Sequence, residues 1–155
     1  DAAERCRAIR EGRLEGYFLG KLSHVQLDRG EAGRAAATLA ESLTLLSEAG
    51  DVRHEGLFLT YQATLESVHG RVDGARTALG SARVRLASVN DGLLLAALEL
   101  RAMAVEFRGA NASRGEAQAL LEAAKAARSG RAPRVEQSEE VRLAARVLER
   151  ALARP

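Results

Sequence analysis

The chain has few residues that could stabilise a small fold by means other than its hydrophobic core. Its 155 residues include one cysteine, Cys6, so no disulfide can form within the chain and the fold must rest on packing. Its two prolines, Pro133 and Pro155, leave residues 1–132 without an obligate helix breaker. Aromatic residues make up only 3% and tryptophan is absent, so the core must be built from leucine, valine and many alanines, which favours helices.

Long apolar runs and a large net charge are also missing. No stretch approaches the roughly 20 apolar residues that cross a bilayer, and no basic segment followed by an apolar one forms a leader. We therefore expect a cytoplasmic protein without membrane contact. The formal net charge is only +2, because acidic and basic residues nearly cancel along the chain, so we expect no direct contact with nucleic acid.

What the sequence does contain is an internal repeat. The phrase Glu15-Gly16-Tyr17-Phe18-Leu19-Gly20 returns forty residues later as Glu55-Gly56-Leu57-Phe58-Leu59-Thr60. The same spacing relates Gly30 to Gly70, Ala35 to Ala75, Leu39 to Leu79, Leu46 to Leu86 and Asp51 to Asp91. A period of this length is typical of a solenoid, in which each unit is too small to bury its own apolar face and stacks on its neighbours.

Each period contains two helical stretches separated by a turn, which predicts an antiparallel helix pair. We expect helices over about 13–29, 32–49, 52–69, 72–89, 92–108, 114–128 and 135–152, with Gly30, Gly50, Gly70 and Asn90 in the turns and a longer turn from Gly109 to Ser113. Asp51 and Ser113 are expected to cap the helices that follow them. Residues 129–133 are the one stretch that reads as a linker.

The fold class predicted is therefore all-α, an α-solenoid of antiparallel helix pairs with about three repeats and a C-terminal capping helix, in one domain over residues 1–155. The predicted units are 13–50, 51–90, 91–130 and a capping helix over 134–153, and residues 1–12 read as the end of a preceding helix. In the capping helix, Val141, Ala145, Leu148 and Leu152 share an apolar face. Its charged residues are expected on a solvated outer face: Glu136, Glu139, Glu140, Arg142, Arg146, Glu149 and Arg150.

Small residues recur where the two helices of a unit are expected to cross. Ala35 and Ala75 are followed one turn later by Leu39 and Leu79, and then by the small residues Ser42 and Ala82. In the third unit the same small-large-small order is expected at Ala117, Leu121 and Ala124. Burying each leucine should contribute about 1.5–3 kcal/mol.

These residues, in this order, resemble the tetratricopeptide repeat (TPR) family: Leu19, Leu22, Ser23, Gly30, Ala35, Leu39 and Ser42 in the first unit, with Leu59, Ala63, Gly70, Ala75, Leu79 and Ala82 in the second. Gln62 and Glu99 depart from the pattern. The forty-residue period, together with the run from Gly50 to Leu59, is similar to the long repeats of maltose-activator-type (STAND) signalling ATPases and related multidomain bacterial regulators. The resemblance implies a scaffold that senses or assembles, while other domains of a longer chain carry out catalysis or DNA binding.

Residues with catalytic or metal-binding potential do not converge in the sequence. His24, His54 and His69 have no partners at the spacing of metal ligands and are expected to be surface histidines. The glycines between Gly12 and Gly20 follow no strand and precede no Gly-Lys-Ser/Thr, which speaks against a phosphate loop. We therefore expect no enzyme, no cofactor and no metal.

The first helix of each unit is expected to line the inner wall of the solenoid. Its non-core positions present a mixed cationic, aromatic and apolar groove, for which the candidate residues are Tyr17, Lys21, His24, Asp28, Tyr61, Thr64, Arg101 and Arg108. In this interpretation Lys21, Arg101 and Arg108 hold carboxylates of an extended peptide or a helix, and Tyr61 supplies rigid contact area. The alternatives are that the wall is solvated, or that another part of the parent protein fills it.

The sequence thus predicts a non-catalytic scaffold for protein or peptide partners, including other domains of the same parent chain, in a larger bacterial signalling or transcription-regulating protein. The alternative is a sensor of a small ligand or signal peptide, in which an effector fills the concavity and changes the superhelical curvature. Self-association through the terminal helices is also expected to be possible, because such helices expose apolar faces that normally stack on a neighbour.

Overall fold

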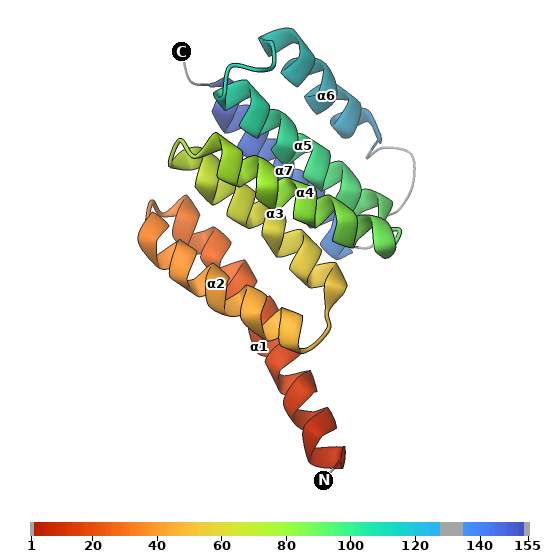
Figure 1. Ribbon diagram of the computed structural model, residues 1–155. Helices are drawn as coiled ribbons and strands as arrows, with labels where there is room; N and C mark the ends of the chain where they lie inside the picture. The colour runs from red at the N-terminus through yellow and green to blue at the C-terminus, as the bar shows by residue number, and fades with distance from the viewer. Residues whose placement is uncertain (1, 128–134, 154–155) are drawn as a thin grey trace.

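The computed structural model describes residues 2–127 and 135–153, and within these ranges every regular element is an α-helix (Figure 1). The helices are α1 (Ala2–Asp28), α2 (Ala32–Glu48), α3 (Val52–Val68), α4 (Val72–Ser88), α5 (Gly92–Arg108), α6 (Arg114–Ala127) and α7 (Val135–Leu152). Neighbouring helices pack pairwise, α1 with α2 and α3 with α4. The all-α solenoid of antiparallel helix pairs is therefore confirmed. The linker expected at 129–133 lies outside the described residues.

The prediction for the N-terminal segment is wrong. Residues 1–12 were expected to end a separate helix, but the structure shows one continuous helix from Ala2 to Asp28, whose first turns project from the body (Figure 1). The reason is that Gly12 stands alone, without the left-handed conformation that ends the later helices. A single glycine costs a helix about 1 kcal/mol but does not end it.

The turns recur at half the period of the forty-residue sequence repeat. Backbone φ is positive every twenty residues: 80° at Gly30, 66° at Gly50, 76° at Gly70, 49° at Asn90 and 59° at Ala110. The third turn between paired helices therefore bends at Ala110, whereas Gly109 keeps a φ of −78°. An alanine thus occupies a conformation that costs an L-residue about 1–2 kcal/mol.

This strain gives the first prediction. Ala110→Gly should raise the free energy of unfolding by about 0.5–1 kcal/mol, since relief of the left-handed strain exceeds the entropy gained by the unfolded chain. Urea unfolding followed by circular dichroism measures it. The matched control is Ala37→Gly in the interior of α2, at an exposed position, which should lower stability by about 1 kcal/mol. Two changes of the same sign would contradict the assignment of Ala110 as the strained residue.

The predicted crossing residues are buried as expected, from Ala35, Leu39 and Ser42 to their equivalents forty residues on. The closest approach, however, is made by the glycines of the repeated phrase. A Cβ atom at Gly16 would lie 2.9 Å from Leu46, and one at Gly56 would lie 2.9 Å from Leu86. The Glu-Gly phrase therefore recurs because it lets the second helix of each unit pack against backbone.

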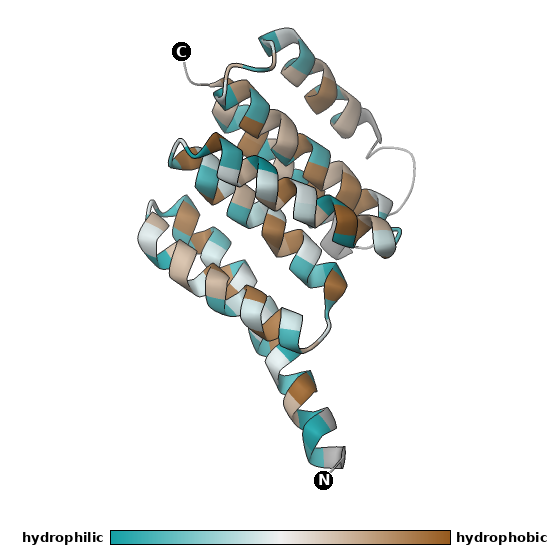
Figure 2. Ribbon diagram, in the orientation of Figure 1, coloured by the Kyte–Doolittle hydropathy of each residue, from teal (hydrophilic) through white to brown (hydrophobic). Residues whose placement is uncertain are grey.

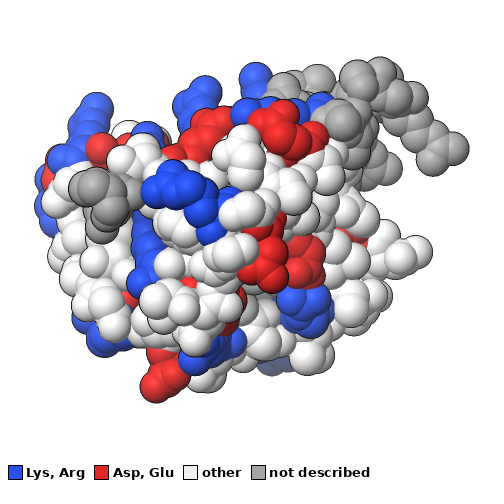
Figure 3. All heavy atoms as spheres, turned by 90° about the horizontal axis from the view of Figure 1, so that it is seen from above, with Lys and Arg blue, Asp and Glu red and all other residues white. Residues whose placement is uncertain are grey.

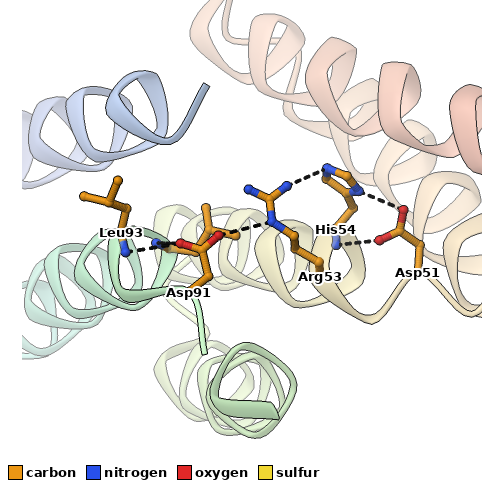
Figure 4. Close-up of polar contacts among 6 residues, drawn as sticks. Asp51, Arg53, His54, Asp91 and Leu93 are labelled. Atoms are coloured by element: carbon orange, nitrogen blue, oxygen red, sulfur yellow. Dashed lines mark hydrogen bonds and ion pairs between the residues drawn. The ribbon is translucent and has the colours of Figure 1, made fainter. Parts of the chain in front are cut away.

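Successive units are joined by apolar packing and by a chain of polar contacts at the start of each first helix. Asp51 accepts from the backbone N–H of His54 at 3.1 Å, which confirms it as a cap. Arg53 reaches from α3 to Asp91, the equivalent residue at the start of α5, with 3.1 Å between Nε and Oδ2 (Figure 4). Asp91 also accepts from the N–H groups of Leu93 and Leu94. The pair of Arg53 with the capping Asp91 thus joins the start of α3 to the start of α5.

The third unit departs from the plan. α5 was expected to pair with α6, but it packs most extensively against α7, and α6 lies more loosely against both. Ala96 stands at the position of Gly16 and Gly56, so its Cβ atom occupies the space through which α2 and α4 approach their partners. Ser113 caps α6 as predicted, since its Oγ accepts from the N–H of Glu116 at 3.2 Å. Leu121 and Ala117 are buried in a second core cluster formed by α5, α6 and α7.

Candidate functional site: the inner wall and helix α7

Two residues of the predicted inner wall, Lys21 and Tyr61, contact the chain's own last helix. Lys21, Tyr61 and Arg101 occupy the same place in α1, α3 and α5, because they are forty residues apart. Ala97 and Ala104, which flank Arg101 on α5, are buried in one cluster with residues of α7. In Figure 1, α7 runs behind α5, the helix against which it packs most extensively. The wall is therefore covered by α7 at α5, and Glu140 of α7 extends this contact to Tyr61 on α3.

Glu140 fixes α7 to two of the predicted wall residues. Its carboxylate accepts a hydrogen bond of 2.7 Å from the Tyr61 hydroxyl on α3 and forms an ion pair with Lys21 on α1. Glu140 is 0% exposed, so its expected place on a solvated outer face is wrong. A buried carboxylate is stable only when paired and hydrogen-bonded, and Tyr61 and Lys21 satisfy that condition. The side chain of Glu136 lies outside the described residues, whereas the remaining charged residues of that face are exposed as predicted.

A second contact holds the other end of α7. Arg150 donates to Asp28, near the end of α1, at 2.5 Å, and His24 Nε2 lies 3.9 Å from the same carboxylate. Arg114, the first residue of α6, donates to the carbonyl of Leu152 at 2.7 Å. The end of α7 therefore lies beside the end of α5, and the two helices are parallel. α7 thus follows the wall from the level of Lys21 to that of Asp28.

Arg101 is the least satisfied of the wall's charged groups. It is 1% exposed, its Nη1 donates to Thr64 Oγ1 at 3.1 Å, and its guanidinium lies 4.4 Å from the centre of the Tyr61 ring. Its Nε and Nη2 are buried and make no hydrogen bond with the described residues. Stacking on an aromatic face stabilises the cation, but it gives these two N–H donors no acceptor in the guanidinium plane.

The buried contacts shift two pKa values in directions that keep Glu140 bound. Burial alone would lower the pKa of the Lys21 ammonium, but the Glu140 carboxylate outweighs burial and raises it. Burial, followed by the negative charge of Glu140, raises the pKa of the Tyr61 hydroxyl well above its ordinary value. Lys21 therefore remains charged and Tyr61 remains a hydrogen-bond donor across the physiological pH range.

His24 is not the surface histidine that was expected. Its side chain is 11% exposed, and its ring centre lies 5.1 Å from that of Tyr61. Burial and, second, the positive charge of Arg101 lower the pKa of its imidazole to about 4, against the opposing attraction of Asp28 and Glu140. Arg150 on α7 lowers it further. His24 is therefore neutral at pH 7.

A pH dependence of stability follows. A histidine whose folded pKa lies below its unfolded value of about 6.5 binds its proton more readily in the unfolded chain, so stability is complete above pH 6.5 and falls from there towards pH 4. The expected loss in that window is about 3 kcal/mol. Urea titrations at pH 7, 5.5 and 4 measure it. His24→Gln should remove most of the fall and His69→Gln should not; equal falls in both variants would contradict the assignment to His24.

The remaining predicted residues support the wall from within. Thr64 accepts from Arg101 and donates to the Thr60 carbonyl, and Arg108 donates to Ser67 at 3.4 Å. The ring of Tyr17 packs edge-on against His54, with 4.9 Å between ring centres, and lies near Phe58. The structure thus brings Lys21, His24, Asp28, Tyr61, Thr64 and Arg101 together with Glu140 and Arg150. Tyr17 lies at the joint between the first two units and also beside the wall, since Lys21 Nζ lies 5.7 Å from the centre of its ring.

Sequence reasoning missed Glu140 and Arg150 because they lie outside the repeat and have no equivalents to compare. One signal was present. α7 buries Ala144, Val147 and Ala151 in addition to the predicted apolar face, so its apolar surface spans more than one stripe. Such a width is typical of a helix covered on two sides.

The other surfaces of the molecule are less suited to binding. α1 carries an exposed apolar stripe of Leu14, Phe18, Leu22 and Val25. A hollow of about 260 Å³ lies beside it, lined by Arg13, Leu14, Tyr17, Asp51 and His54. It is smaller than the roughly 300–1,000 Å³ of most small-ligand pockets. On the face shown in Figure 3, basic and acidic side chains are interspersed, and Figure 2 shows the apolar residues spread over all the helices.

The structure describes residues 2–127 and 135–153, and two absences hold within these ranges. No helix in these ranges is both long and apolar enough to traverse a bilayer. No group of three or more histidine, cysteine, aspartate or glutamate side chains there is arranged to hold a metal ion.

Comparison of the chain with protein-family models, with curated proteins and with solved structures finds no match.

Proposed function

We propose that the chain is a non-catalytic interaction module of the tetratricopeptide kind, which docks a helical segment of a protein on the inner wall formed by α1, α3 and α5. Its setting, in this proposal, is a larger bacterial signalling or transcription-regulating protein, and its partner is another protein or another domain of the same parent. The observation that carries the proposal is the position of α7. This amphipathic helix lies on the wall and is anchored through Glu140 to Tyr61 and Lys21. We call the part of the wall that α7 contacts its seat.

The chemistry of the wall supports helix docking over other occupants. Small residues at Ala97 and Ala104 let a helix approach α5 closely, and both are buried under α7. Charged side chains at the two ends of the seat set position and direction, since Glu140 and Arg150 meet partners of opposite charge on α1. Apolar contact along the seat with charge pairs at its ends is a common mode of helix-in-groove recognition.

The proposal is tested by binding in trans. A fluorescein-labelled peptide of residues 135–153 is titrated onto the full chain carrying Glu140→Gln, which weakens the hold of its own α7. We expect a dissociation constant well below about 1 mM, and at least tenfold weaker binding when Tyr61→Ala or Lys21→Glu is added. Val84→Ala is the control, because Val84 is exposed and lies on α4, which is not one of the helices that form the wall. No binding below millimolar, or binding that Tyr61→Ala leaves unchanged, would reject the proposal.

A further inference from the structure

α7 leaves part of the wall's binding capacity unused. The wall places two buried or half-buried cations at one level, Lys21 and Arg101, and α7 brings one carboxylate, Glu140, to that level. Lys21 takes this carboxylate and Tyr61 donates to its other oxygen. Arg101, which is more deeply buried than Lys21, has Thr64 Oγ1 as its one hydrogen-bond acceptor among the described residues.

The two free donors of Arg101 have a geometry of their own. Nε and Nη2 lie on the same edge of the guanidinium plane, and neither has an acceptor in the described part of the chain. A carboxylate binds such an edge through two parallel hydrogen bonds, one to each of its oxygens. Leaving buried donors of a charged group without acceptors is costly, so an occupant that supplies this carboxylate gains binding energy that α7 does not have.

The position of the missing carboxylate can be placed on the helix. Ala144 follows Glu140 by one turn and is buried in the same cluster as Ala97 and Ala104, which flank Arg101 on α5. An alanine side chain carries no polar atom and buries little area. The apolar contacts of α7 come from Val141, Leu148 and the other buried residues of its apolar face, so a partner helix must reproduce these contacts as well as the carboxylate at the position of Glu140.

We propose that the partner of the inner wall is an acidic amphipathic helix with two carboxylates one turn apart, and that it displaces α7. The first carboxylate takes the place of Glu140 on Tyr61 and Lys21, and the second forms a bidentate pair with Arg101. This inference rests on the proposed function and adds the chemistry of the partner and its competition with α7. α7 is then a resident occupant that keeps the wall covered until a better-matched helix arrives.

The test uses the full chain carrying Glu140→Gln and three labelled peptides of residues 135–153: the native sequence, one with Ala144→Glu and one with Ala144→Gln. We expect the Ala144→Glu peptide to bind at least tenfold more tightly than the Ala144→Gln peptide. Arg101→Lys keeps the positive charge but loses the two parallel N–H donors of the guanidinium. It should reduce this ratio of affinities to about threefold or less. Hydrogen exchange should show faster exchange of the protein's own α7 amides when the acidic peptide is bound.

The outcomes separate the two proposals. If none of the three peptides binds, the proposed function fails together with the inference. If the native peptide binds but the added carboxylate gives no advantage, or an advantage that Arg101→Lys leaves intact, the acidic partner is rejected while helix docking stands. Binding without faster exchange of α7 rejects displacement. The last experiment adds inorganic phosphate at 10 mM to the chain without peptide. If phosphate stabilises the chain and Arg101→Lys removes this effect, the site binds a small anion and the inference is overturned.

Discussion

Replacing Phe58 by alanine should lower the free energy of unfolding by about 3–5 kcal/mol, the largest stability effect we expect from a single apolar truncation in this chain. Phe58 is 0% exposed and lies at the joint of the first two units. Its ring fits against Gly20 of α1 so closely that a methyl group at Gly20 would overlap it. It also packs edge-on against Tyr61, with 5.2 Å between ring centres. The alanine variant leaves a cavity between two units, where neither helix pair can close it alone.

The repeat supplies the matched control. Phe18 stands forty residues before Phe58 in the same phrase, yet it is 65% exposed. Phe18→Ala should therefore change stability by less than about 0.5 kcal/mol. Urea unfolding of both variants, followed by circular dichroism, measures the difference. If the chain self-associates through the exposed stripe of α1, Phe18→Ala should weaken that association in sedimentation experiments.

A small effect of Phe58→Ala, or equal effects of the two variants, would contradict the stacking of units described here. The comparison is informative because residue type and local sequence are nearly the same at the two positions. What differs is the neighbouring unit. Any difference in cost therefore measures the packing between units and not the helix propensity of phenylalanine.

The architecture could be predicted from the sequence because it repeats. In the first two units the turns, crossings and caps recur, so that Gly30 supports Gly70 and Asp51 supports Asp91. The prediction is wrong where the repeat weakens. In the third unit Ala96 replaces the packing glycine, and α5 packs mainly against α7, although α6 was the predicted partner.

Only one side of the candidate site, the wall, could be predicted from the sequence. The wall residues Lys21, Tyr61 and Arg101 share a repeat position, and this placed them on one face. Their occupant is not part of the repeat, and the periodicity of α7 gave no reason to bury Glu140, since glutamate at the edge of an amphipathic helix is usually solvated. Its burial depends on Tyr61 and Lys21, which are 79 and 119 residues away. Contacts of that range carry no local signal.

Glu140→Ala should detach α7 from the wall, at a cost of about 2–4 kcal/mol to the region that α7 covers. Removal of the carboxylate leaves the Tyr61 hydroxyl without its acceptor and takes the counter-charge from Lys21, whose side chain is 23% exposed and can turn partly to water. Because Lys21 can reach water in this way, the expected loss of stability lies below the largest losses found when one partner of a fully buried ion pair is removed. Because Glu140 is buried, added salt should change the effect little.

Glu139→Ala is the matched control, since Glu139 is the adjacent residue and is exposed. It should change stability by less than about 0.5 kcal/mol. Native-state hydrogen exchange is the sharper measurement, because detachment of α7 is a local opening that global unfolding can miss. Amides of α7 should exchange about 30- to 1,000-fold faster in Glu140→Ala, the equivalent of that local cost, whereas amides of α2 should be unchanged. Glu140→Gln should fall between the two, because an amide oxygen still accepts from Tyr61 but carries no charge for Lys21. If α7 exchanges at the same rate in both alanine variants, Glu140 is not the anchor, and the wall holds α7 through its apolar contacts alone.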